Sequence, residues 1–241
     1  MKKLSILLLC IALLPVKLLA QKEKVQNDPT HDDKLIHFGF SLGLNSMDYR
    51  IKSASTNKTV FVDVNKLSPG INIHAIANLR LAKNFDLRAL PGISFGERFV
   101  SFKNLENDSA IYDNNNAYKI QSSYIEMPLL LKYKSRRLNN IRPYLIGGGN
   151  FRYDLAIKGA YDYHDQLFMI KPFDVYAEIG VGSDFYLTYF KLGVELKFSI
   201  GLTNILNRTD KHGQIPPEFQ KYTDYMESIK SQMFILSFHF E

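Results

Sequence analysis

The chain has almost none of the residues that form disulfides or carry thiol chemistry. Its 241 residues contain one cysteine, Cys10, and no tryptophan. Cys10 lies in an apolar N-terminal run with the form of an export signal, so cleavage would remove the only cysteine. An exported protein without disulfides needs another source of stability, either a full core or closed hydrogen bonding.

After its first twenty residues the chain also lacks a long apolar run. No later stretch reaches the 18 or more apolar residues that indicate a membrane-spanning helix. The N-terminal run is short, follows two lysines, and is interrupted by Pro15 and Lys17. These features favour a signal peptide over residues 1–20, cleaved after Ala20, rather than a membrane anchor. A lipoprotein is excluded because Cys10 lies mid-run and not at the cleavage point.

A large excess of charge of one sign is absent too. Cleavage removes Lys2, Lys3 and Lys17, which lowers the formal net charge from +6 to +3. This balance gives no indication of a nucleic-acid partner.

What the chain does contain is strict alternation. In residues 190–202, large apolar residues alternate with charged residues, Ser or Gly. A strand points successive side chains to opposite faces, so this stretch has one apolar and one polar face, whereas a helix would scatter the apolar residues. The stretch is long enough for a tilted strand that spans an outer membrane, which needs roughly 9–11 residues.

The same alternation predicts eight strands, and the connections between them are alternately long and short. The strands are 35–47, 70–82, 85–100, 119–134, 142–155, 173–185, 190–202 and 230–241. Pro91 cannot donate to a ladder, so we expect a bulge or a local break there. Antiparallel strands then place the short turns and both termini at one end, as in outer-membrane barrels with short periplasmic turns.

The predicted fold class is therefore all-β: an eight-stranded antiparallel up-and-down transmembrane β-barrel with a polar lumen, spanning residues 35–241. It is preceded by a flexible periplasmic tail, residues 21–34, and it lies in the outer membrane with both termini in the periplasm. The first strand must pair with the eighth to close the barrel, because every backbone N–H and C=O group in lipid needs a hydrogen-bond partner within the protein. An aromatic girdle is expected at the short-turn ends, formed by Tyr133, Tyr144, Tyr186, Tyr189 and Phe190.

The alternative is a soluble, lipocalin-like barrel with the apolar face inside. Long strands, a second face rich in Gly and mixed charges, and the lack of disulfides and Trp favour lipid outside.

The polar face would line a lumen that is just wide enough for side chains to fill. Its charged residues have both signs, so we expect them to pair into a plug, with an open aqueous pore as the alternative. They are Arg80, Arg88, Glu126, Lys132, Arg152, Asp154, Glu178, Asp184, Lys191, Glu195 and Lys197. His37, His74 and His239 share this face. Closure would bring His37 near His239, either as ordinary lumen residues or as a metal-binding or pH-sensitive pair.

No motif for catalysis, cofactor binding or metal binding is present, so we expect that this protein is not an enzyme. His31-Asp32-Asp33 offers only adjacent ligands, without a partner at a known spacing. Asp108-Ser109-Ala110 is similar to an acceptor for bacterial O-glycosylation, over three residues only.

Two stretches carry a family resemblance. Residues 123–134, Ser-Tyr-Ile-Glu-Met-Pro-Leu-Leu-Leu-Lys-Tyr-Lys, and residues 38–45, Phe-Gly-Phe-Ser-Leu-Gly-Leu-Asn, resemble the PorT-like family of outer-membrane β-barrels. Residues 140–150 and 195–206 resemble the member of that family that is the barrel component of the type IX secretion system, which is also linked to gliding motility.

The resemblance implies a non-enzymatic role in exporting cargo with C-terminal sorting domains, with other secretion components and outer-membrane lipids as partners. The long loops, the tail or the basic turn, residues 134–137, would be the docking surfaces. For the basic turn, a solvated charge cluster that faces the lipid headgroups is an equally good interpretation. A general barrel with adhesive or ligand-binding loops, and a lipid-modifying barrel enzyme, remain as the other functions.

Overall fold

The computed structural model describes residues 27–29, 34–53, 60–63, 68–104, 118–157, 169–208 and 226–241. The expected signal peptide, the His31-Asp32-Asp33 stretch and the Asp108-Ser109-Ala110 acceptor lie outside these ranges. Within them, all regular structure is β-strand, and no helix has the length and hydropathy to cross a bilayer.

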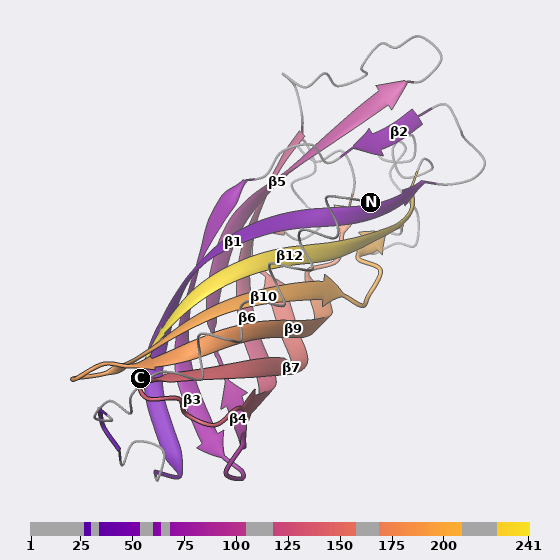
Figure 1. Cartoon of the computed structure of the whole chain (residues 1–241). Coiled ribbons are helices and arrows are strands. Elements are labelled where there is room, and N and C mark those ends of the chain that lie inside the picture. Colours follow the sequence, from indigo (N-terminus) through magenta and orange to yellow (C-terminus); the bar gives the residue numbers. More distant parts are fainter. Residues whose placement is uncertain are drawn as a thin grey trace, which may run out of the picture.

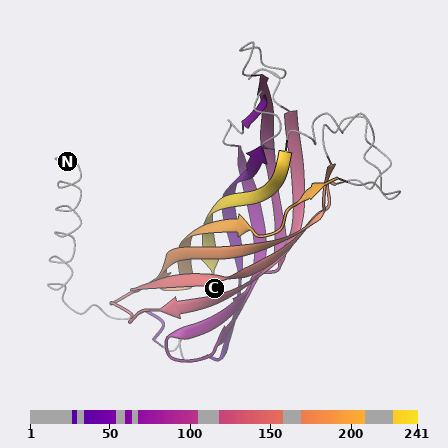
Figure 2. The ribbon, with the colours of Figure 1, turned by 90° about the vertical axis from the view of Figure 1, so that its right-hand side faces the viewer.

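Eight antiparallel strands form a closed ring (Figure 1, Figure 2). In ring order the elements are β1 (Ile36–Ser53), β3 (Pro69–Arg80), β4 (Phe85–Ala89) with β5 (Gly92–Asn104), β6 (Tyr118–Lys134), β7 (Ile141–Asp154), β9 (Phe173–Tyr186), β10 (Lys191–Gly201) and β12 (Met226–Phe240). The first strand, β1, pairs with both β3 and the last strand, β12. The predicted closure of the first strand on the eighth is confirmed.

β4 and β5 act as one barrel strand with a local break at Pro91. The register against the neighbouring strand is the same on both sides of the break, Ala77 opposite Ala89 and His74 opposite Gly92. The carbonyl of Pro91 still accepts a hydrogen bond from the Ala75 amide at 2.9 Å. The strand therefore lacks one donor but contains no bulge, because no extra residue is inserted.

Three short elements extend the long-loop end. β2 (Val60–Asp63) pairs with the end of β5, and this pair projects beyond the other strands (Figure 1). β8 (Met169–Ile170) pairs with β11 (Leu206–Asn207). At the opposite end the connections are short, with residues 81–84, 135–140 and 187–190 between the strands.

The apolar face of the alternation points outward and the polar face points inward. On β1, Phe38, Phe40, Leu42 and Leu44 are exposed, and between them Ser41 and Asn45 are buried. The same holds around the ring, where exposed apolar residues include Ile71, Ile73, Ile125, Leu129, Leu145, Ile179, Val181, Leu196 and Phe198. An outward apolar belt around a polar interior is the pattern that a surrounding lipid phase requires.

Toward the long loops this pattern reverses on β1 and β12. Beyond Ser46, the buried residues of β1 are apolar, Met47 and Tyr49, and the outward residues are polar, Asp48 and Arg50. The long loop predicted between the first two strands, residues 48–69, is wrong for residues 48–53 and 60–63, which belong to β1 and β2. The reversal explains the error, because a strand that leaves an apolar medium for water buries the opposite type of side chain.

Two members of the predicted aromatic girdle face inward. Tyr144 and Tyr186 are only 3% and 2% exposed, whereas Tyr133, Tyr189 and Phe190 are exposed as expected. Strand parity gives the reason, because Tyr144 lies two residues from the inward Arg142, and Tyr186 two residues from the inward Asp184.

Candidate functional site

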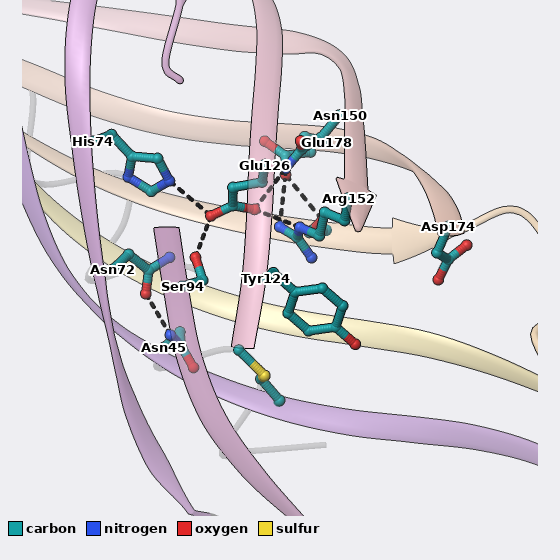
Figure 3. A network of polar contacts seen from close by, with 12 residues as sticks. Asn45, Asn72, His74, Ser94, Tyr124, Glu126, Asn150, Arg152, Asp174 and Glu178 are labelled. Carbon is teal, nitrogen blue, oxygen red and sulfur yellow. Dashed lines mark hydrogen bonds and ion pairs between the residues drawn. The ribbon is translucent and has the colours of Figure 1, made fainter. Parts of the chain in front are cut away.

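The lumen contains a network of ion pairs centred on Glu126 (Figure 3). One carboxylate oxygen of Glu126 lies 2.7 Å from His74 Nε2 and also accepts a hydrogen bond from the Ser94 hydroxyl. The other oxygen accepts from the Arg152 guanidinium and, at 2.9 Å, from the Asn150 amide. These residues come from β3, β5, β6 and β7, so a single carboxylate joins four strands of the wall.

Glu178 on β9 extends this network. Its Oε1 accepts hydrogen bonds from the Arg152 guanidinium at 3.0 Å and from the Asn150 amide at 2.8 Å. Its Oε2 lies 2.7 Å from the ammonium nitrogen of Lys197 on β10. Charges therefore alternate in sign from Glu126 through Arg152 and Glu178 to Lys197, as buried charges require.

A second network lies nearer the short turns. Arg88 donates to Glu195 at 3.3 Å and to Glu241 at 2.9 Å, and Lys191 pairs with Glu241 at 2.6 Å. Lys132 pairs with Asp184 at 2.6 Å.

Tyr144 connects these ion pairs to an apolar layer. Its hydroxyl donates to Glu195 at 3.0 Å, and its ring lies 3.7 Å below the ammonium group of Lys132. The ring also packs in a buried apolar cluster inside the barrel that contains Ile76, Leu90, Leu130 and Ile146.

A third cluster surrounds Arg98 near the long-loop end. The guanidinium donates to the hydroxyls of Tyr49 at 2.7 Å, Tyr124 at 2.6 Å and Ser122 at 3.0 Å. It also lies over both tyrosine rings, 4.3 Å and 5.3 Å from their centroids. The charge is thus stabilised by hydroxyls and aromatic faces.

The lumen is packed with side chains. Arg88, Lys132, Arg152 and Glu195 are 1% exposed or less. Of the eleven charged residues predicted to face inward, all are buried except Arg80, which is half-buried at the short-turn end. These contacts form the predicted plug of paired charges. Buried side chains that fill the lumen leave no wide path through the barrel.

The expected proximity of His37 and His239 is wrong. His239 lies opposite Ser41 on β1, four positions along the strand from His37, which is roughly 13 Å at 3.3 Å per residue. His239 Nε2 instead contacts Glu195 at 3.2 Å, and His74 contacts Glu126. The part of the chain that the structure describes contains no group of three or more metal-ligating side chains.

The basic turn, residues 134–137, is largely engaged by the protein itself. Lys134 is buried and pairs with Asp86 at 2.7 Å. The guanidinium carbon of Arg137 lies over the ring of Tyr186, 3.6 Å from its centroid, and the side chain donates to the backbone carbonyls of Asn27 and Asp28. Arg136 is the exposed cation of the turn.

The N-terminal segment is thereby fixed at the short-turn end. The Asn27 amide nitrogen donates to Asn140 Oδ1 at 2.9 Å, and its side chain donates to the carbonyl of Tyr186 at 3.1 Å. We call this set of contacts, from Asn27 and Asp28 to Arg137, Asn140 and Tyr186, the N-terminal seat. Sequence reasoning missed it, because no periodic signal marks a contact between residues 109 or more positions apart.

Arg98 was also missing from the predicted charged lining, although its neighbour in parity, Asp86, falls on the same polar face as Arg88. Arg98 has the same strand parity as Arg88, so the alternation itself could have identified it.

Comparison with known families gives a match over most of the chain. The model of the family described as the outer membrane protein beta-barrel domain matches residues 19–207. The match therefore includes every barrel strand except β12. No curated protein matches the chain.

Proposed function

This chain belongs to the outer membrane protein β-barrel domain family. Within that family, we propose that it acts as a non-enzymatic outer-membrane component of the type IX secretion system. The observation that carries the proposal is the resemblance of residues 140–150 and 195–206 to PorT, the barrel component of that system. The role would be to support export of cargo with C-terminal sorting domains, and with it gliding motility.

The packed lumen supports a role through the surface of the barrel. A lumen filled by ion pairs such as Arg152–Glu178 offers no route for a polypeptide. The barrel would therefore dock to other secretion components. The short-turn end is the favoured docking surface, because the N-terminal seat holds the segment around Asn27 there and leaves Arg136 exposed beside it.

The proposed orientation puts the short turns in the periplasm. Asn27 and the C-terminal Glu241 both lie at this end, Asn27 against Tyr186 and Glu241 against Lys191. Outer-membrane barrels have their short turns on the periplasmic side, which supports the orientation.

A clean in-frame deletion tests the proposal. Cargo with a C-terminal sorting domain is measured in the periplasm and in the medium. We expect accumulation in the periplasm and recovery on complementation with the full-length chain. Normal cargo in the medium would contradict the secretion role and leave the barrel with another function.

The second candidate is a barrel whose extracellular loops bind ligands or surfaces. It is favoured by the β2–β5 pair, which projects beyond the barrel at the long-loop end (Figure 2). Replacing residues 54–67 by a short linker separates the two functions. Secretion should persist in this variant, whereas adhesion or ligand binding should be lost.

A further inference from the structure

Two cations stand directly opposite each other on the outside of the closure seam. Arg50 on β1 and Lys230 on β12 are register partners, and both are exposed. Like charges in directly opposed positions of an antiparallel pair repel each other, since their Cβ atoms are about 4.5–5.5 Å apart. The pair therefore weakens the seam unless an anion lies between the two side chains.

The nearby carboxylates, Asp48 and Glu227, form no ion pair with either cation within the described residues. Asp48 accepts hydrogen bonds from the Tyr49 amide at 2.7 Å and from the Gln232 side chain at 2.7 Å. Glu227 pairs with Lys52 at 2.8 Å. Within the described ranges, neither Arg50 nor Lys230 has an ion pair or a side-chain hydrogen bond.

The position of the pair corresponds to a headgroup layer. Phe234 is the last exposed apolar residue of β12 before the pattern reverses, and Lys230 lies four positions beyond it. At about 3.3 Å per residue and a tilt of about 40°, the rise along the barrel axis is roughly 10 Å. Long Arg and Lys side chains reach back over such a distance, so their charges lie at the boundary where lipid headgroups begin.

We propose that Arg50 and Lys230 bind the phosphate group of an anionic lipid at the long-loop edge of the apolar belt. The Arg guanidinium presents paired donors that match two phosphate oxygens, and the Lys ammonium adds a second positive charge from the neighbouring strand. One phosphate between them turns the repulsion across the seam into attraction. The bound lipid is then a clamp on the two strands that close the ring.

The proposal is independent of the secretion role. It uses the orientation proposed above only to assign the lipid to the outer leaflet, and the experiment below uses the purified barrel, so its result is separate from any secretion assay.

The test measures binding of diphosphorylated lipid A and of its dephosphorylated form to the full-length mature chain in maltoside micelles. We expect the phosphorylated lipid to bind more tightly. Arg50→Gln and Lys230→Gln should each weaken its binding about fivefold, from the ~1 kcal/mol that a cation contributes near an anionic lipid surface. The matched control is Lys34→Gln with Lys83→Gln, which removes two exposed positive charges at the opposite end and should leave binding unchanged.

Lys230→Glu separates lost binding from lost folding. It creates an Arg50–Glu pair across the seam, so the urea midpoint should not fall, while binding of the phosphorylated lipid is lost. Three outcomes would each overturn the proposal. The dephosphorylated lipid could bind as tightly as the phosphorylated one, or the double variant Arg50→Gln with Lys230→Gln could bind the phosphorylated lipid with unchanged affinity. The third is displacement of the lipid by an equal concentration of inorganic phosphate.

Discussion

The ring of Phe40 on β1 stacks on the ring of Phe240 on β12, with centroids 4.8 Å apart and planes 13° from parallel. The two residues are register partners at the short-turn end of the closure seam. Phe190 lies on the other side of Phe240, with 6.0 Å between the ring centroids. Aromatic contacts thus hold the last strand to both neighbouring parts of the wall.

Phe240→Ala should weaken the seam. An aromatic pair contributes about 1 kcal/mol beyond the area that it buries, so we expect a loss of about 1–2 kcal/mol in the free energy of unfolding. Urea unfolding of the barrel in lipid vesicles measures this loss. Phe234→Ala is the control, because Phe234 is an outward residue of the same strand with no ring contact among the described residues. An equal effect of the two changes would argue against a specific role of the stack.

Glu126→Ala should be among the most destabilising single changes in the lumen. It leaves His74, Ser94 and one face of Arg152 without their acceptor inside the barrel. Removing one partner of a buried ion pair costs about 3–5 kcal/mol. Glu97→Ala is the matched change outside the barrel, where Glu97 pairs with Lys119 at 2.6 Å on an accessible surface, and there we expect less than about 1 kcal/mol. The same unfolding assay compares the two, and similar losses would contradict the network's role.

Arg137→Ala should release the N-terminal seat without unfolding the barrel. The change removes the donors to the Asn27 and Asp28 carbonyls and the stacking on Tyr186. A spin label on Asp28→Cys should become more mobile by electron paramagnetic resonance. Arg136→Ala, which removes the exposed neighbour, should leave the label's spectrum as it is. An unchanged spectrum in Arg137→Ala would show that other contacts hold the segment.

The purified barrel should not conduct ions steadily in a planar bilayer. The ion-pair networks and the apolar layer of Ile76, Leu90, Leu130 and Ile146 fill the lumen. Combined replacement of Leu130 and Ile146 by Ala should raise the frequency of brief openings, because it removes packing between the two networks. Stable ohmic current from the unaltered barrel would contradict the packed lumen.

Alternation along the strands predicted most of the wall and the lining. Residues such as Arg88, Glu126 and Glu195 could be placed inside because side-chain direction follows from sequence position alone once one face is assigned to lipid. The ring closure followed from the need to pair every backbone group in lipid.

The partners inside the lumen could not be predicted in the same way. Which carboxylate meets Arg152, or which residue lies opposite His239, depends on the register between strands, and the alternation does not set it. The inward direction of Tyr144 could have been predicted, because it lies an even number of residues from the inward Arg142 on the same strand. It was missed because the girdle was assigned by residue type near a turn and not by face.

The ion pairs between distant strands also constrain how the barrel can form. Arg88 on β4 and Lys191 on β10 both depend on Glu241, and Glu195 contacts His239 on β12. Until β12 is in place, Lys191 lacks its carboxylate and Arg88 keeps only Glu195. A charge that faces hydrocarbon without compensation costs several kcal/mol. Stepwise insertion of hairpins is therefore unfavourable. The wall has to be completed outside the hydrocarbon or beside a catalyst that shields it, and membrane entry and neutralisation of the interior then become a single event.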